Sequence, residues 1–329
     1  MAAPAAMGTL TLDHRARRGK VGVLWQGTRM TTDRTTANGI SIAFEDKGPR
    51  DAPAILLVMG LGGQLTLWPD EFVDALVARG FRTIRYDNRD VGLSTRFDAA
   101  GVPNLKWMFV KAALGLPVRS AYRLADMADD GVALLDRLEI DRAHVVGASM
   151  GGMIAQHIAA SHPGRTLSLT SIMSTTGNRR LPRAKKEAMQ VLANRPMSGD
   201  PEDMIAYSVR AARVIGSPGY PAEEERLQRR VRGDFERGWY PQGVARQMAA
   251  IVADGDRRPM LKAVRAPTLV IHGEADPLVP IAGGRDTAAH IAGARLMTIP
   301  GMGHDLPLAL VDTLADAIAE HAKGAAVAA

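Results

Sequence analysis

Residues 144–156 read HVVGASMGGMIAQ and place one serine at the junction of two different local structures. The β-branched Val145 and Val146 favour a buried strand, whereas the apolar run 153–155 favours a helix. Ser149 stands between them, and its near neighbours are the glycines Gly147, Gly151 and Gly152. A hydroxyl at a turn whose neighbours have almost no side chain is the first feature of this sequence to explain.

Residues 147–151 match the pattern G-x-S-x-G, which presents a nucleophilic serine when it follows a strand and opens a helix. In that context the backbone at the serine is strained, and small neighbours are required to avoid clashes. The backbone N–H groups of the helix N-terminus then lie beside the hydroxyl and favour negative charge. The alternative is a serine that only caps a helix in a glycine-rich turn, so the partners of Ser149 decide between the two.

A nucleophilic serine needs a base, and the chain has eight histidines. His304 stands in the glycine-rich stretch 299–307 (IPGMGHDLP), just past the last predicted strand, and loops at strand ends present catalytic groups. His272 also ends a predicted strand, but the turn after it carries a carboxylate candidate of its own. The other histidines lie within predicted helices or strands or near the termini. His304 is therefore the predicted base.

The base needs an orienting carboxylate. In proteins whose serine stands in a G-x-S-x-G turn between a strand and a helix, this carboxylate lies between the serine and the histidine in sequence. The turn 272–280 (HGEADPLVP) offers Glu274 and Asp276 directly after a strand. Pro277 restrains the turn and biases Asp276 towards an extended conformation, which makes Asp276 the preferred candidate. The predicted triad, in chain order, is Ser149, Asp276 and His304.

Short apolar runs alternate with amphipathic ones along most of the chain, which predicts an α/β fold with a mostly parallel sheet and helices on both faces. The predicted strands are 40–46, 54–60, 81–87, 143–148, 166–173, 267–273 and 294–300. Helices are predicted at 69–80, at about 122–138 and from Ser149 to about 161, with a further helix at the C-terminal end.

The alternation is interrupted once for a long interval, which defines the predicted domain organisation. Residues 177–258 have helical spacing and no convincing strand, and we interpret them as a helical cap insertion. Residues 34–176 and 259–329 then form the core, and 1–33 form an N-terminal extension. The extension and the Ala-rich end 322–329 are predicted to be loosely ordered.

Composition excludes several classes of function. Cysteine is absent from the 329 residues, so disulfides, thiolate metal sites and cysteine nucleophiles are excluded. The net charge of +6 is modest, and the basic clusters carry no interleaved stacking aromatics, so no nucleic-acid partner is expected. No stretch approaches the length of a membrane span, and the N-terminal residues make a poor secretory signal, so we expect a cytoplasmic protein. No metal-ligand spacing or dinucleotide fingerprint is visible, and no metal or cofactor is expected.

The motifs resemble those of the α/β-hydrolase superfamily across nearly all of residues 39–320. Within this superfamily the chain is most similar to the aclacinomycin methylesterase group, in the stretches LLVMGLGGQLTLWPDEF (56–72), RYDNRDVGLST (85–95), VVGASMGG (145–152) and IPGMGHDLP (299–307). In that group a Met-Gly pair replaces the usual His-Gly, and here the pair is Met59-Gly60. The resemblance implies an α/β-hydrolase fold, Ser149 as nucleophile, Asp276 as acid and His304 as base. It also implies an oxyanion hole formed by two backbone N–H groups, those of Leu61 and Met150.

The predicted function is that of a metal-free serine carboxylesterase acting on a small or medium apolar ester through an acyl-enzyme. A second insertion, 104–118, carries Trp107 and Phe109, which together with Trp239 of the cap are candidates for substrate binding. The same triad would also serve a cofactor-free perhydrolase or haloperoxidase, or a hydrolase of C–C bonds. A catalytically silent ligand-binding protein is the remaining alternative, and the sequence leaves the oligomeric state open.

Overall fold

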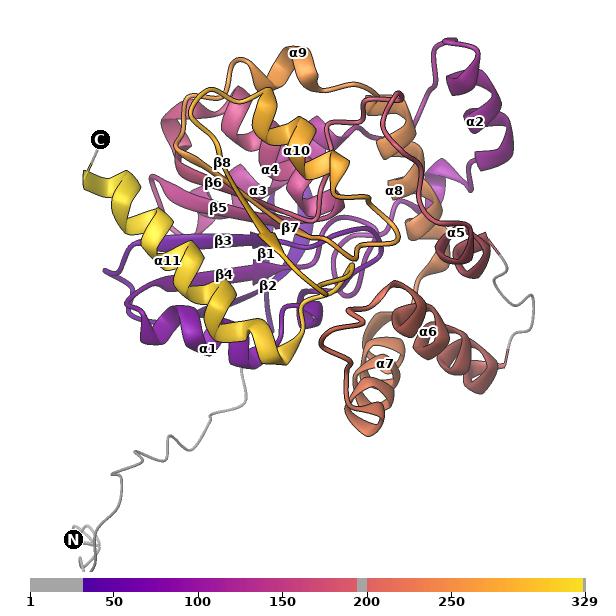
Figure 1. The fold of residues 1–329 in the computed structure, drawn as a ribbon, viewed down its shortest axis with the longest axis horizontal. Coiled ribbons are helices and arrows are strands. Elements are labelled where there is room, and N and C mark those ends of the chain that lie inside the picture. The colour runs from indigo at the N-terminus through magenta and orange to yellow at the C-terminus, as the bar shows by residue number, and fades with distance from the viewer. Residues whose placement is uncertain (1–31, 194–199, 328–329) are drawn as a thin grey trace, which may run out of the picture. The chain divides into compact units, whose positions relative to one another are not determined.

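The computed structural model describes residues 32–193 and 200–327, which belong to one compact unit. Nearly all of the predicted N-terminal extension, 1–33, lies outside the described residues. The centre of the unit is an eight-stranded sheet with the strand order β1-β2-β4-β3-β5-β6-β7-β8 (Figure 1). The strands are β1 (Asp33–Ala37), β2 (Ile40–Lys47), β3 (Ala54–Val58), β4 (Arg82–Tyr86), β5 (Ala143–Ala148), β6 (Thr166–Ile172), β7 (Thr268–Gly273) and β8 (Arg295–Ile299).

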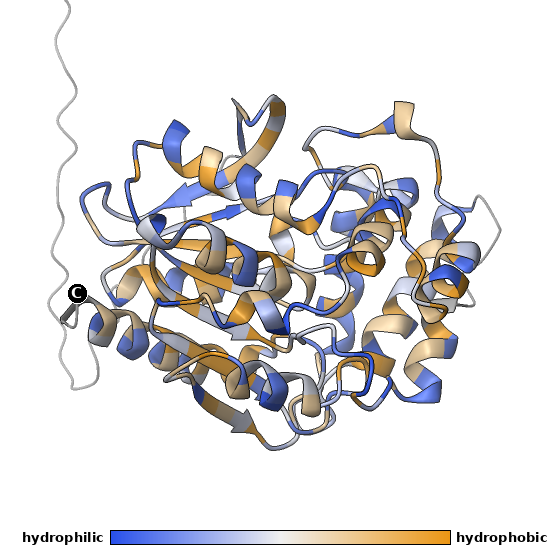
Figure 2. Ribbon diagram, turned by 90° about the horizontal axis from the view of Figure 1, so that it is seen from above, coloured by the Kyte–Doolittle hydropathy of each residue, from blue (hydrophilic) through white to orange (hydrophobic). Residues whose placement is uncertain are grey.

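The sheet is antiparallel only at one edge, where β1 pairs with β2 and β2 pairs with β4. All other neighbouring strands are parallel. Every residue of β3, β4, β5 and β7 is buried, as expected for parallel strands covered on both faces. The continuous apolar runs of the sequence therefore correspond to the middle of the sheet, and the strands of Figure 2 are mainly hydrophobic.

Helices cover both faces of the sheet (Figure 1). On one face α1 (Asp70–Ala78) packs against α11 (Val311–Val327). The other face carries α3 (Leu124–Arg137), α4 (Met150–Ser161) and α10 (Ala282–Ala289). Four short 3-10 helices connect these elements, namely Leu65–Leu67, Asp98–Ala100, Pro163–Arg165 and Leu308–Leu310. The predicted α/β class with helices on both faces is confirmed.

Between β6 and β7 the described residues form helices and no strand. These helices are α5 (Lys186–Ala193), α6 (Pro201–Ile215), α7 (Glu224–Gly238), α8 (Pro241–Asp254) and α9 (Arg258–Leu261). The first four lie within the segment 177–258 that the sequence assigns to a cap, and the exact division into core and cap stays a prediction. A further helix, α2 (Leu105–Ala113), lies in the second insertion and projects from the body of the unit (Figure 1).

Two segments differ from the sequence-based expectation. β1 is not among the predicted strands, because DRTTA has no apolar alternation; it is an edge strand with mostly exposed side chains, held by pairing with β2. The Ala-rich end was expected to be loose, yet α11 continues to Val327. Alanine is the best helix former, and Ala322 and Ala325 are buried against the core.

Candidate active site

Ser149 occupies a sharp turn between β5 and α4. Its backbone has φ 57° and ψ −120°, a region that non-glycine residues rarely adopt and that costs about 1–3 kcal/mol. A Cβ added to Gly147 would lie 2.1 Å from the carbonyl oxygen of Gly151, and one added to Gly151 would lie 1.9 Å from that of Val58. The glycines of the opening motif are therefore required by backbone packing, and the turn raises the serine above the sheet.

The structure brings the three predicted triad side chains together. Ser149 Oγ lies 2.9 Å from His304 Nε2, and His304 Nδ1 lies 2.7 Å from Asp276 Oδ2. Asp276 follows β7 and His304 follows β8, so the parallel strands deliver all three groups to one edge of the sheet. In this arrangement the serine hydroxyl donates to the imidazole, and the imidazole donates to the carboxylate.

The carboxylate and the imidazole are both fixed by further hydrogen bonds. Asp276 is buried, and its second oxygen, Oδ1, accepts the backbone N–H groups of Leu278 at 2.9 Å and Val279 at 2.8 Å. The backbone N–H of His304 donates to the carbonyl of Ile215 at 2.7 Å, at the end of α6. The loop that carries the histidine is thus held by a helix of the predicted cap.

The two competing candidates of the sequence are not part of this hydrogen-bonded series, although His272 Nε2 lies 3.6 Å from Asp276 Oδ2. His272 is fully buried, its Nε2 is 2.8 Å from the carbonyl of Val279, and burial lowers its pKa, so the ring is neutral and acts as a structural donor. Glu274 is exposed and accepts a hydrogen bond from the hydroxyl of Thr298. The hydrogen bonds of Asp276 and His304 distinguish them from these two neighbours.

The loop after β3 passes directly over the serine. A Cβ added to Gly60 would lie 2.9 Å from Ser149 Cβ and 3.4 Å from its Oγ, so only glycine allows this approach. Leu61 follows in this loop, and Met150 is the first residue of α4. Leu61 is thus the neighbour of Gly60 in this loop, and Met150 is the neighbour of Ser149; the oxyanion hole expected from their backbone N–H groups stays a prediction.

Gln247 on α8 contacts the same loop and was not identified from the sequence. The backbone N–H of Gly62 donates to Gln247 Oε1 at 2.8 Å, and Gln247 Nε2 donates to the carbonyl of Arg89 at 2.8 Å. The side chain of Gln247 is fully buried. No local motif signals this residue, because its partners lie far away in the sequence and meet it only in the folded chain.

The charged turn after β4 is held by hydrogen bonds within itself and to other segments of the chain. Asp87 is fully buried and accepts the N–H groups of Leu65 at 2.8 Å and Leu93 at 2.9 Å, and burial raises its pKa. Arg89 donates to Asp130 at 2.6 Å. These groups brace the turn, which lies at the same edge of the sheet as Ser149 because β4 and β5 are both parallel to β3.

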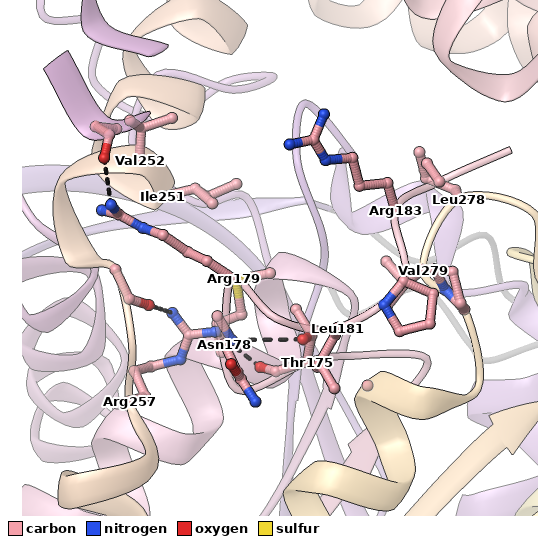
Figure 3. A pocket seen from close by; sticks show the side chains of 18 of the residues that line it. Thr175, Asn178, Arg179, Leu181, Arg183, Ile251, Val252, Arg257, Leu278 and Val279 are labelled. Carbon is pink, nitrogen blue, oxygen red and sulfur yellow. Dashed lines mark hydrogen bonds between the residues drawn. The ribbon is translucent and has the colours of Figure 1, made fainter. Parts of the chain in front are cut away.

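A cavity of about 420 Å³ is lined by neighbours of the triad in sequence, although Ser149, Asp276 and His304 are not among its described lining residues (Figure 3). Met153, one helical turn after Ser149, lines it, and so do Leu278 and Val279, which hold Asp276. Of the three predicted substrate contacts, Phe109 lines the cavity. Trp107 and Trp239 are not among its described lining residues: Trp107 is half exposed, and Trp239 stacks on Phe235 with ring centroids 5.4 Å apart.

Two absences hold for the part of the chain that the structure describes. Residues 32–193 and 200–327 contain no group of three or more His, Asp or Glu side chains placed to hold a metal ion. Within the same residues no helix is both long and apolar enough to cross a membrane.

Comparison with known proteins defines the class of the chain. Residues 53–308 match the family described as alpha/beta hydrolase fold, so the chain belongs to the α/β-hydrolase family. Two similar relatives are the rhodomycin D methylesterases DnrP of Streptomyces peucetius and DauP of Streptomyces sp. strain C5, at 31% and 30% identity over 321 residues. Each alignment covers 91% of this chain and 100% of the relative. The predicted family resemblance is confirmed.

A solved structure supports the same fold. The enol-lactonase from Burkholderia xenovorans LB400 superposes with a TM-score of 0.66 over 88% of this chain and 100% of its own. Its sequence is 23% identical, so the likeness concerns the arrangement of helices and strands only.

Proposed function

We propose that the protein is a serine carboxylesterase that cleaves an apolar ester, with a small alcohol such as methanol as leaving group. The hydrogen-bonded series of Ser149, His304 and Asp276 carries this proposal, because it is the arrangement that activates a serine for attack on a carbonyl. The ester-hydrolase class expected from the sequence agrees with the relatives named as methylesterases.

In the proposed mechanism His304 Nε2 takes the proton of Ser149 as Oγ attacks the ester carbonyl. Asp276 holds the imidazole in the required tautomer and stabilises its positive charge. The imidazolium then donates its proton to the departing alcohol, which leaves an acyl-enzyme. Water activated by His304 releases the acid and restores the serine.

The backbone N–H groups of Leu61 and Met150 stabilise the negative oxygen that forms during attack. Gly60 lets this loop approach the serine, and the hydrogen bond from Gly62 to Gln247 fixes the loop. The cavity that contains Phe109 and Met153 supplies space for the acyl group. A cavity of this volume fits a medium-sized apolar acid.

The proposal is tested with a panel of p-nitrophenyl and methyl esters of increasing acyl length. Ser149→Ala and His304→Ala are each expected to lower kcat by about 10⁴-fold or more, and the double variant is expected to lose little more, because triad members act as a unit. Asp276→Asn is expected to lose activity as well, whereas Glu274→Gln, a matched change in the same turn, keeps it.

Labelling with a serine-directed phosphonate separates the alternatives. We expect the phosphonate to label the wild-type protein and not the Ser149→Ala variant. A wild-type protein that is not labelled would instead be a ligand-binding protein without catalysis. Peroxide-dependent halogenation, or cleavage of a diketone in the absence of ester hydrolysis, would replace the esterase assignment by one of the other two chemistries of this triad.

A further inference from the structure

The exposed apolar side chains of the described residues are concentrated in one place. Ten large hydrophobic side chains are exposed in the described chain, and six of them lie between residues 102 and 116. These six form what we call the α2 surface, namely Val102, Trp107, Phe109, Val110, Leu114 and Leu116. A cluster of this kind on a single short segment marks an interaction site rather than ordinary surface variation.

The segment is built to leave these side chains outside. Met108 is the buried side chain of α2, and α2 packs through this side against α8. The side chain of Asn104 caps the helix by accepting the N–H of Trp107 at 3.0 Å. The helix is thus fixed by one buried residue and one cap, and it projects from the unit with its apolar side chains exposed (Figure 1).

The two stretches of sequence at the α2 surface carry basic side chains and no acidic ones. Residues 99–125 contain no Asp, Glu or His and carry the basic residues Lys106, Lys111, Arg119 and Arg123. The neighbouring stretch 177–186 also lacks acidic residues, and its five basic side chains, all exposed, are Arg179, Arg180, Arg183, Lys185 and Lys186. The two stretches touch, because Arg179 donates a hydrogen bond to the carbonyl of Ala112 at the end of α2 (Figure 3).

This combination specifies the chemistry of the partner. A second copy of the chain would bring two such basic groups together, and their repulsion disfavours that partner. An uncharged apolar partner would leave the basic groups without a counterpart. An anionic lipid surface satisfies both features, since its headgroups attract Lys and Arg while Trp, Phe and Leu enter the headgroup and acyl boundary.

We propose that the α2 surface docks the protein peripherally on a membrane surface that contains anionic lipid. Trp107 and Leu114 insert, and Lys106 and Lys111 contact the headgroups. The contact is interfacial, in keeping with the described residues having no helix that could cross a membrane. Phe109, Ala112 and Ala113 of this segment also line the cavity, so docking places the cavity beside the lipid.

Vesicle flotation tests the docking, with the full-length Ser149→Ala variant used so that lipid hydrolysis plays no part. Flotation with vesicles of phosphatidylcholine and phosphatidylglycerol is expected, with release by high salt, and little flotation with phosphatidylcholine alone. Binding that is equal on both kinds of vesicle overturns the assignment of an anionic surface.

Paired substitutions locate the contact. Trp107→Ser with Leu114→Ser is expected to weaken vesicle binding by at least about tenfold, since two large apolar side chains no longer enter the lipid. Leu296→Ser with Leu308→Ser is the control, because these two leucines are also exposed large hydrophobic residues, at 38% and 40%, but lie outside the α2 surface. Retained binding by the first pair, or equal loss by both pairs, overturns the proposal.

Two further readouts separate this partner from the others. Brominated lipid is expected to quench the fluorescence of Trp107, with Trp107→Phe as the blank that binds but lacks the quenched signal. A dimer in sedimentation that the Trp107→Ser and Leu114→Ser pair dissociates would identify a second copy as the partner and overturn the lipid assignment. These measurements do not depend on ester hydrolysis, so their failure and that of the proposed function are distinguishable.

Discussion

The helices α8 and α2 pack against each other, yet they make very different contacts. On α8 two consecutive polar residues, Arg246 and Gln247, are buried and bonded to the core, whereas on α2 Met108 is the buried side chain. The core offers α8 the carboxylate of Asp90 and the carbonyl of Arg89. The comparison shows that one helix, α8, is tied to the core through buried polar side chains, whereas α2, which packs against it, leaves most of its large apolar side chains exposed.

Breaking the ion pair of α8 is expected to have the largest effect. Arg246 and Asp90 form a bidentate pair, with both N–O distances at 2.8 Å, and both side chains are buried. Arg246→Ala leaves a buried carboxylate without its cation, which costs about 3–5 kcal/mol in the free energy of unfolding. Urea denaturation measures this, and Lys106→Ala on α2 is the control, with a change within about 0.5 kcal/mol. Equal effects of the two substitutions would remove the distinction between the helices.

Acid is expected to weaken the core while leaving the charge of α2 unchanged. His144 on β5 is buried beside Ser168, and burial lowers its pKa from 6.5 to about 4. The unfolded chain therefore binds a proton between these pH values that the folded chain does not bind, so stability falls as the pH decreases from 6.5 to about 4. A shift of this size corresponds to about 3 kcal/mol.

Urea denaturation at neutral pH and near the lower limit of that window checks this prediction. His144→Gln is expected to reduce the slope of stability against pH, because the variant lacks the buried imidazole. Burial lowers the pKa of His272 and His321 too, so part of the slope remains in the variant. A wild-type stability that is flat across the window would contradict the neutral, buried state of His144.

Removing the amide of Gln247 is expected to affect catalysis more than folding. Gln247→Ala frees the N–H of Gly62, so the loop that carries Leu61, whose N–H belongs to the proposed oxyanion hole, is no longer fixed. We expect kcat for p-nitrophenyl esters to fall by about 10- to 100-fold with little change in KM, because the lost positioning acts on the transition state. Gln228→Ala is the matched control, since Gln228 bonds only an exposed glutamate of its own helix. A purely structural role would instead lower Tm without this split between kcat and KM.

Substitutions on the α2 surface are expected to have the smallest effect in solution. Trp107→Ser with Leu114→Ser exposes no core and removes no described hydrogen bond of these side chains, so Tm and the hydrolysis of p-nitrophenyl acetate are expected to match wild type. Stopped-flow or steady-state assays with this water-soluble ester give the rates. A large loss of kcat would mean that α2 belongs with α8 as part of the catalytic framework.

The parts of the fold that the sequence predicts are those with local signals. Val145 and Val146 indicate a buried strand, and the G-x-S-x-G motif indicates the turn and the helix that follow. Asp276 and His304 follow strands with clear apolar runs, so their position at one edge of the sheet could be expected. The structure places these side chains in hydrogen-bond contact, and their catalytic roles stay predictions.

What the sequence does not predict depends on pairing between distant residues. Gln247 meets Gly62 across 185 positions, and neither residue stands in a pattern that announces the other. β1 is polar and is a strand only because β2 offers it an edge. Trp107 and Phe109 were grouped as substrate contacts by residue type, and only the placement of α2 shows that Phe109 alone of the two lines the cavity.

The contact between the histidine loop and the end of α6 has a consequence for protein engineering. Ile215 accepts the backbone N–H of His304, and the hydroxyl of Ser217 accepts that of Gly303 at 2.8 Å. The helical segment between β6 and β7 is therefore not a module that can be exchanged whole. A chimera that imports the helical segment of a relative must keep the junction around residues 215–217, or the transplant carries new specificity to a site whose base is no longer held in place.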